Sequence, residues 1–364
     1  MNKFIPISQP HISEKDIEYV TDAVRSGWVS SIGKYIEMFE ESFASYCGTR
    51  FALSTANGTT ALHLALVSLG ISSEHEVIIP DLTFVATANA VKYTGAKVVT
   101  VDIEEDTLCI DPQKIEAAIT PNTRAIIPVH LYGHPADMHK IMKLAVKYDL
   151  HVIEDAAEAH GACINGQRVG SFGDCGVFSF YGNKIITAGE GGMVTTNNEA
   201  LYEKMKFLRD HAMSREKRYW HTDVGYNYRI TNLQAALGVA QLNRIEQIIE
   251  KKAEIYFQYR QELQNVKGLK LNYTKENVKN VFWMICVEID DLNEKMRDQL
   301  MQRLRKENID TRPYFYPISD MPMFENANTD ITHKVFQRGF NLPSFFDLKE
   351  SEVCYICQKL KELI

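Results

Sequence analysis

The stretch Phe178-Ser-Phe-Tyr-Gly-Asn-Lys-Ile-Ile-Thr-Ala-Gly-Glu-Gly-Gly-Met193 runs from one short aromatic and β-branched segment into another through a glycine-rich loop. Around it, residues 51–198 alternate short apolar segments with stretches whose apolar residues recur at helical spacing. Such alternation is typical of βα units that feed a largely parallel sheet. We predict strands at residues 51–55, 76–80, 97–102, 125–128, 151–154, 176–180 and 192–196, and helices at 60–69, 112–118 and 138–148.

The pattern changes after residue 198. Segments 199–211 and 232–263 have the apolar spacing of helices, and we expect the second to be one long helix. Further on, the sequence favours a strand at 282–288 and helices at 293–306 and 352–364. The second half of the chain is therefore predicted to mix helices with a few strands.

The length of 364 residues is large for one compact core. We predict an α/β protein with a large domain at residues 1–245, which includes an N-terminal arm and is built around a mostly parallel sheet. A smaller α+β domain is predicted at residues 246–364. A cleft between the two is a plausible place for an active site.

The composition excludes several classes of protein. The chain has 40 basic and 47 acidic residues and a net charge of −7, which is too acidic for nonspecific binding of nucleic acid. No apolar run approaches the ~20 residues that cross a bilayer, and residues 1–10 lack the apolar core of a signal peptide. We therefore expect a cytoplasmic protein that acts on a small molecule, with no membrane partner. The seven scattered cysteines form no framework, so we expect reduced thiols and no metal site.

Lys184 lies in the glycine-rich loop, and Asp155 follows the predicted strand at 151–154, 29 residues upstream. A lysine amine can form a Schiff base with the aldehyde of pyridoxal phosphate, and a carboxylate can keep the pyridine nitrogen protonated. Taken singly, a lysine is more often a solvated surface group and an aspartate at a strand end more often a helix cap. Together they suggest a pyridoxal phosphate enzyme.

Other polar and aromatic residues follow the predicted strands. Gly58 and Thr59 stand at a helix start, where free amides attract a phosphate, although Thr59 could simply be an N-cap. Phe84 could stack on a flat ring or belong to the core, and Ser179 could bind the phosphate or only the backbone. Arg229 could pair with an anion or act as a clamp within the fold. Ligands of α/β sheets sit where strands end, so we expect residues 57–59, Phe84, Asp155 and Ser179 to share one cleft.

The chain resembles the DegT/StrS family of sugar-nucleotide aminotransferases from about residue 5 to its C-terminal end. The segments that carry the resemblance are 57–59, Phe84, 154–159, 178–184, 189–193 and 225–231. Within the family the chain is most similar to the branch that makes GDP-perosamine, on the strength of segments 26–35, 180–184, 218–221, 312–317 and 341–344.

The resemblance implies a fold-type I aminotransferase that uses pyridoxal 5′-phosphate, and a homodimer whose active sites lie at the subunit interface. Lys184 is then the Schiff-base lysine, and Asp155 pairs with the pyridine nitrogen. The other implied cofactor contacts are Glu158 at the phenolic oxygen, Phe84 on the ring, Gly58, Thr59 and Ser179 at the phosphate and, from the partner subunit, Asn227. Monomers should therefore be inactive.

The implied reaction has two stages. Glutamate gives its amino group to the cofactor, and a nucleotide-linked 4-keto-6-deoxyhexose then takes it at C4, with Lys184 moving the proton in each stage. Many family members have Gln at the position of Glu158 and His at that of Tyr181, and both departures match the perosamine-type branch. A lyase branch has His in place of the lysine, and this chain keeps Lys184.

The substrate predicted by the resemblance is GDP-4-keto-6-deoxy-D-mannose. The alternatives are a UDP-linked 4-keto sugar that gives a viosamine-type product, a sugar dehydratase, and a noncatalytic homologue with the same fold. Aromatic faces bind sugars and bases, and cationic groups bind diphosphates. On that chemistry the candidate substrate-binding residues are Trp28, Tyr35, Trp220, His221, Arg229, Tyr314 and Tyr316.

Overall fold

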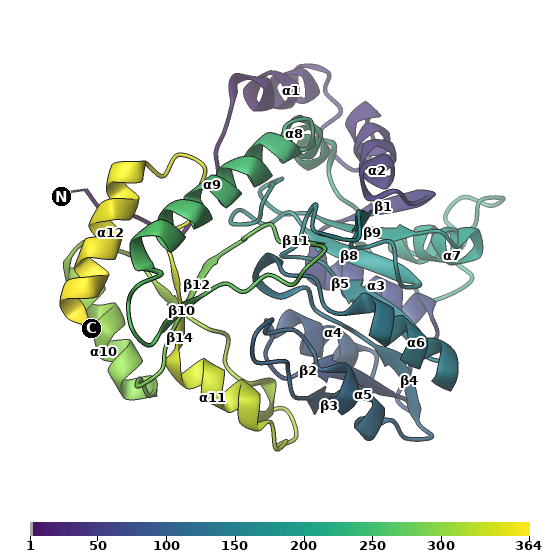
Figure 1. Cartoon of the computed structure of the whole chain (residues 1–364). Helices are drawn as coiled ribbons and strands as arrows, with labels where there is room; N and C mark the ends of the chain where they lie inside the picture. Colours follow the sequence, from purple (N-terminus) through teal and green to yellow (C-terminus); the bar gives the residue numbers. More distant parts are fainter. Residues whose placement is uncertain (1–2) are drawn as a thin grey trace.

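The computed structural model describes residues 3–364 and has a seven-stranded sheet at its centre (Figure 1). The strands follow the order β1-β9-β8-β5-β4-β2-β3 across the sheet. Only β9 runs against its neighbours, since it pairs antiparallel with β8 and β1 while the other pairings are parallel. The strands are β1 (Phe51–Thr55), β2 (Glu76–Pro80), β3 (Lys97–Val101), β4 (Thr123–Ile126), β5 (His151–Asp155), β8 (Cys175–Ser179) and β9 (Gly192–Thr196). The predicted α/β class with a mostly parallel sheet is confirmed.

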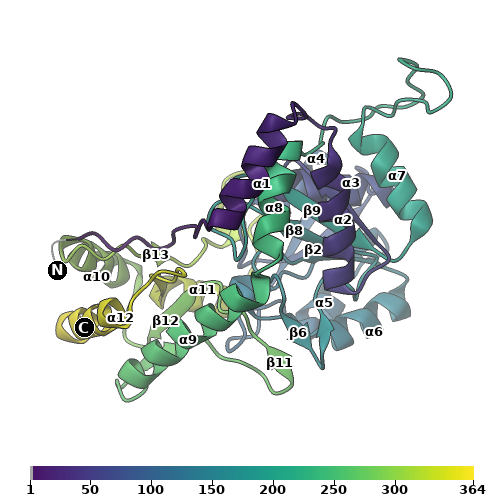
Figure 2. The same cartoon turned by 90° about the horizontal axis from the view of Figure 1, so that it is seen from above.

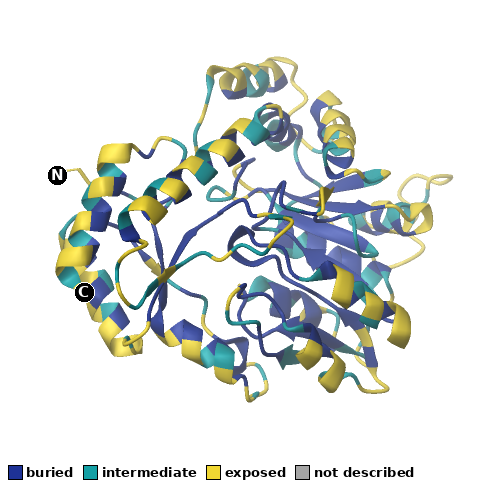
Figure 3. Ribbon diagram, viewed as in Figure 1, coloured by how far each residue is buried: buried dark blue, intermediate teal, exposed yellow. Residues whose placement is uncertain are grey.

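Alternate side chains of the strands pack on opposite faces of this sheet. In β2, Val77 and Ile79 belong to one apolar cluster and Ile78 to another. The first cluster contains residues of α3 (Gly58–Ser68), α4 (Ala86–Tyr93) and α7 (Glu199–Arg209). The second contains residues of α1 (Glu14–Arg25), α2 (Lys34–Cys47), α5 (Pro112–Ala118), α6 (Met138–Tyr148) and α8 (Asn232–Leu242). The sheet is thus covered on both faces, and its strands are buried (Figure 3).

A second, antiparallel sheet lies in the C-terminal part of the chain. Its order is β10-β12-β14-β13, with β10 (Leu269–Leu271), β12 (Ile285–Ile289), β14 (Gly339–Leu342) and β13 (Arg312–Pro313). The helices of this part are α9 (Ile245–Leu263), α10 (Glu294–Lys306), α11 (Asp330–Arg338) and α12 (Glu350–Leu363). Ile5 is buried in the apolar cluster that most of these helices and strands form, and it makes an isolated β-bridge with Ile309. The N-terminal segment therefore runs along the C-terminal part of the chain (Figure 2).

A three-stranded sheet connects the two parts. It has the order β11-β6-β7, with β6 (Cys163–Ile164) and β7 (Gln167–Arg168) following the central strand β5, and β11 (Val278–Lys279) from the C-terminal part. The antiparallel pairing of β11 with β6 fixes one part against the other by backbone hydrogen bonds.

The prediction of one helix over residues 232–263 is wrong. The structure has two helices, α8 and α9, separated at Asn243 and Arg244, and the backbone of Arg244 at φ −125° and ψ 18° is not helical. The partners explain the break, because α8 packs between α1 and α2 whereas α9 packs on α12. Our domain boundary at residue 245 falls at the start of α9 and remains a prediction. No helix within residues 3–364 is long and apolar enough to cross a membrane.

Candidate active site

One pocket, of about 410 Å³, gathers the ends of several strands of the central sheet. Asp155 ends β5, Ser179 ends β8, and Gly58 opens the helix that follows β1. Seven of the eight predicted cofactor residues line this pocket, namely Gly58, Thr59, Phe84, Asp155, Glu158, Ser179 and Lys184. The exception is Asn227.

The first turn of α3 provides a place for an anion. Asn57 caps the helix, and its side-chain oxygen accepts the N–H of Thr60 at 2.9 Å. The N–H groups of Gly58 and Thr59 come earlier in the helix and have no acceptor within it. A Cβ on Gly58 would lie 2.9 Å from the Cβ of Ser179, so glycine allows β8 to bring the Ser179 hydroxyl close to these amides.

Asp155 presents a buried carboxyl group to the pocket. It is 5% exposed, its Oδ2 accepts the hydroxyl of Thr87 at 2.7 Å, and its Oδ1 accepts the N–H of Ala157 at 3.2 Å. Burial raises the pKa of Asp155. A cationic N–H brought against this carboxyl would favour its ionised form. Thr87 was not among the predicted site residues, although its position three residues after Phe84 could have indicated that it lies in the same cleft.

Lys184 points its amine at a second buried acid. The Nζ atom lies 3.7 Å from Oε1 of Glu158, whose Oε2 accepts the N–H of Tyr132 at 2.9 Å. Burial raises the pKa of Glu158 to about 7. The Lys184 amine also lies 4.2 Å from the ring centroid of Trp283. Trp283 follows Lys184 by 99 residues, and nothing in the sequence indicates that the two meet.

Two aromatic rings stand at the edge of the pocket. Phe84 is 54% exposed, and its ring centroid lies 5.7 Å from that of Phe315, which also lines the pocket. Phe315, like Trp283, comes from the C-terminal part of the chain and was not predicted. The pocket therefore combines an anion site, a buried carboxyl group, an amine and an exposed flat ring. This donor set fits the phosphate, the pyridine nitrogen, the aldehyde and the ring face of pyridoxal phosphate.

None of the seven predicted substrate-binding residues lines this pocket. Tyr35 and Tyr314 are only 5% and 1% exposed. The hydroxyl of Tyr35 donates to Asp22 at 2.7 Å, and the ring of Tyr314 packs so closely on Gly339 that a Cβ there would lie 2.2 Å from it. Their burial argues against the substrate contacts predicted for them, because neither offers a surface to a ligand.

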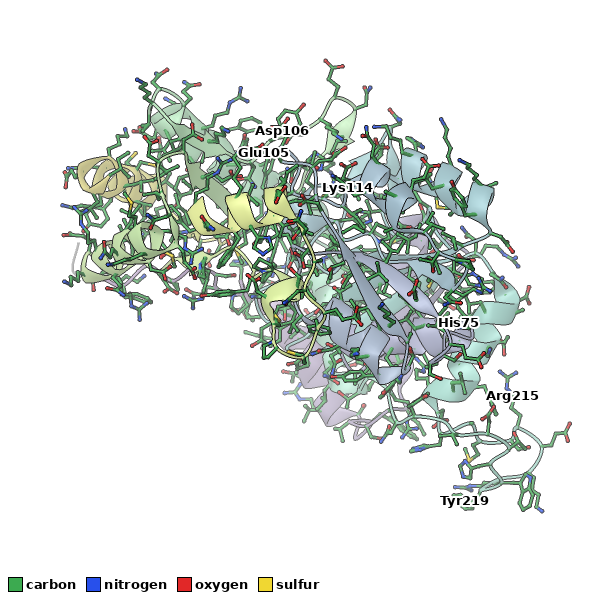
Figure 4. All side chains as sticks on the ribbon, turned by 90° about the horizontal axis from the view of Figure 1, so that it is seen from below. His75, Glu105, Asp106, Lys114, Arg215 and Tyr219 are labelled. Atoms are coloured by element: carbon green, nitrogen blue, oxygen red, sulfur yellow. The ribbon has the colours of Figure 1, made fainter. Side chains whose placement is uncertain are left out.

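The other five candidates are at the surface or partly buried. Trp220 is 53% exposed in a loop after α7 that stands away from the body of the chain, with Arg215 and Tyr219 at its far end (Figure 4). Trp28 is 56% exposed, and the ring of Tyr316 packs on Phe336. The Nδ1 atom of His221 bonds to the carbonyl of His211, and Arg229 forms an ion pair with Asp210. The ion pair of Arg229 with Asp210 fits the alternative role of this arginine as a clamp within the fold.

Asn227 also lies outside the pocket of its own chain. It follows the projecting loop, is exposed, and bridges to Asp210. The structure thus leaves Asn227 apart from the seven predicted cofactor residues that line the pocket.

Residues 10–361 match the model of the DegT/DnrJ/EryC1/StrS aminotransferase family. The chain is 43% identical to the GDP-perosamine synthase of Escherichia coli O157:H7 over 99% of this chain and 98% of that protein. It is 40% identical to the GDP-perosamine synthase of Vibrio cholerae over 98% of each chain. It superimposes on the Streptococcus pneumoniae protein Spr1654 in its PLP form with a TM-score of 0.94 and 27% identity, covering 99% of this chain and 98% of that one. The predicted aminotransferase fold and pyridoxal phosphate cofactor are thereby confirmed.

Proposed function

The chain belongs to the DegT/DnrJ/EryC1/StrS aminotransferase family, and on that premise we propose that it transfers the amino group of L-glutamate to C4 of GDP-4-keto-6-deoxy-D-mannose. The product would be GDP-perosamine. The observation that carries this choice is the 40–43% identity to GDP-perosamine synthases over almost the whole of both chains. Glu158 and Lys184 are both retained, as expected for an aminotransferase of that branch rather than a lyase.

The roles of the pocket residues follow from their positions. When bound, pyridoxal phosphate supplies a carbonyl that accepts the amino group and a ring that withdraws electrons from the reacting carbon. The amides of Gly58 and Thr59 and the hydroxyl of Ser179 would hold its phosphate. Asp155, fixed by Thr87, would accept the N–H of the ring, and Phe84 would cover one ring face.

Lys184 is the base and acid of the proposed reaction. Its Nζ would remove the proton from C2 of glutamate in the first stage and deliver a proton to C4 of the sugar in the second. Glu158, 3.7 Å away, would keep the free amine in the pocket between these steps. The backbone N–H of Tyr132 fixes the orientation of the Glu158 carboxyl group.

We further propose a homodimer with shared active sites. Asn227 is exposed and does not line the pocket of its own chain, which suits a residue that binds the phosphate in the partner subunit. Trp28, Trp220, His221, Arg229 and Tyr316 would meet the nucleotide sugar in the assembled dimer. Each chain would work as two domains, residues 1–245 and 246–364, and the second contributes Trp283 and Phe315 to the pocket.

We place the reaction in the cytoplasm. All seven cysteines are free thiols, and four of the buried ones are Cys47, Cys109, Cys175 and Cys286. A chain whose stability does not rely on disulfides is suited to a reducing compartment.

A competition assay tests the substrate. The holoenzyme is given glutamate and equal amounts of the GDP-linked and UDP-linked 4-keto-6-deoxy sugars, and amino sugars are separated by mass. We expect the GDP product to dominate, and a dominant UDP product would replace the proposal by the viosamine-type reaction. Lys184→Ala should abolish turnover while the protein still binds pyridoxamine phosphate, and repeated turnover by this variant would contradict the role of Lys184.

A further inference from the structure

Trp283 makes two direct contacts with the lysine loop. Its ring lies under the Lys184 amine at 4.2 Å, and its indole N–H donates to the carbonyl of Asn183 at 2.7 Å. The side chain therefore contacts both the charged end of Lys184 and the backbone that carries it. Trp283 is only 5% exposed, so little water screens the contact between the ring and the amine.

The backbone of Trp283 is itself fixed by the C-terminal part of the chain. Its carbonyl accepts the Nζ of Lys252, a residue of α9, at 2.8 Å. The same Nζ donates to the carbonyl of Ser344 at 2.8 Å and to its hydroxyl at 2.6 Å. Lys252 is 5% exposed, and its Nζ lies within hydrogen-bonding distance of these three neutral oxygens. The backbone of Trp283 is thus fixed by the buried Lys252, while its ring contacts Lys184.

A lysine side chain has several rotatable bonds, so a free amine loses its position readily unless something holds it. Glu158 is one such partner at 3.7 Å. The ring face of Trp283 is a second partner, with its centroid 4.2 Å from the amine. Indole is the aromatic group that attracts a cation most strongly.

We propose that Trp283 is a positioning residue for Lys184, which receives the free amine on its ring face and keeps it beside Glu158 whenever Lys184 is not bonded to the cofactor. The inference rests on the proposed role of Lys184 in transamination. It assigns to the C-terminal part of the chain a direct part in placing the amine, through the link Lys252–Trp283–Lys184.

The test measures the Lys184 amine itself. The cofactor-free protein is treated with acetic anhydride over a range of pH, and acetylation of the peptide that contains Lys184 is followed by mass spectrometry. Only the uncharged amine reacts, so loss of a partner that favours the ammonium moves the midpoint of the rate profile to lower pH. The other titratable groups around the amine are Glu158, Asp155, His160 and Lys252, and the substitution leaves them in place.

We expect Trp283→Leu to lower this midpoint by about half a pH unit or more, the size expected for a lost cation–π contact. Trp283→Phe keeps a smaller ring and should shift it less. A change in access to the reagent would alter the plateau rate and leave the midpoint in place, so the two effects separate. Circular dichroism checks the fold of each variant.

The chain offers a control. Lys147 lies 4.8 Å from the ring centroid of Tyr148 in a cation–π pair at the surface of α6, which has no part in the proposed site. Tyr148→Leu should leave the Lys184 midpoint unchanged. An unchanged midpoint in Trp283→Leu, or an equal shift in Tyr148→Leu, would overturn the proposal. If Trp283→Leu does not fold, Trp283→Phe decides, and an unchanged midpoint there would overturn it. The assay contains no sugar nucleotide, so its result does not depend on which substrate the enzyme uses.

Discussion

Replacement of Glu158 by Gln should stabilise the cofactor-free protein, and should do so more at high pH than at low pH. Burial raises the pKa of Glu158 from 4.5 to about 7. An unfolded chain releases this proton near pH 4.5, whereas the folded chain keeps it until about pH 7. Since the unfolded state binds fewer protons between these values, the wild-type free energy of unfolding loses a contribution as the pH rises through this window.

The magnitude follows from the shift. One pKa unit corresponds to about 1.4 kcal/mol, so the full cost of ionising Glu158 in the folded state is about 3 kcal/mol. Part of that cost is already present at about pH 5.5, and the remainder, about 2 kcal/mol, develops between about pH 5.5 and 8.5. Gln avoids this cost because it does not titrate. Its side-chain oxygen can still accept the N–H of Tyr132, which lies 2.9 Å from Glu158.

Urea unfolding of both proteins at several pH values measures the effect. The difference in unfolding free energy between Glu158→Gln and wild type should grow by about 2 kcal/mol from about pH 5.5 to 8.5. Glu41→Gln is the control, because Glu41 is exposed and its replacement should give a difference that varies little with pH. A flat difference for Glu158→Gln would show that the 3.7 Å contact with Lys184 outweighs burial and keeps Glu158 ionised.

Two further substitutions test the pocket and the contact between the central sheet region and the C-terminal part of the chain. Gly58→Ala places a methyl group 2.9 Å from the Cβ of Ser179, so we expect the affinity for pyridoxal phosphate in a fluorescence titration to fall about tenfold or more. The new methyl group in Gly182→Ala meets no atom within 4 Å, so this variant should bind pyridoxal phosphate as wild type does. Equal affinities of the two variants would refute the phosphate site at Gly58 and Ser179. The carboxylate of Asp81 accepts the N–H of Ser319 at 2.7 Å and its hydroxyl at 2.8 Å, and Asp81→Ala leaves both donors unpaired. We expect this variant to lower the free energy of unfolding, measured in urea, by about 2–4 kcal/mol. A loss below about 1 kcal/mol would mean that water replaces these bonds.

The central sheet could be predicted because its strands carry their own signal. A strand buried on both faces is a short β-branched run, and the helices between such runs have a different apolar period. The strands β1, β2 and β9 begin and end at the predicted residues. Residues 58–59, Phe84, Asp155 and Ser179 could be predicted to share a pocket for the same reason, since they end or follow strands and strand ends meet at one edge of a parallel sheet. Glu158 was expected there from the family resemblance alone.

The rest depends on packing between distant segments, which leaves no local pattern. The break at Asn243 and Arg244 is such a case, since both flanking segments are good helices and only their different partners separate them. Trp283 is another, because it precedes β12 and its place beside Lys184 is fixed by Lys252 from α9. Tyr314 was predicted to bind substrate because aromatic residues often do, but its burial depends on the contact with Gly339, 25 residues away.

Two contacts from different parts of the chain fix the position of the Lys184 amine. Glu158 belongs to the central sheet region and lies 3.7 Å from the Lys184 amine, while Trp283 belongs to the C-terminal part and holds the amine by its ring face. A movement of one part against the other would change the second contact and leave the first intact. The pairing of β11 with β6 and the bonds of Asp81 to Ser319 oppose such a movement. The stability of the junction between the two parts is therefore a condition for a well-placed Lys184, and a substitution that weakens the junction should disturb the amine even though it lies outside the pocket.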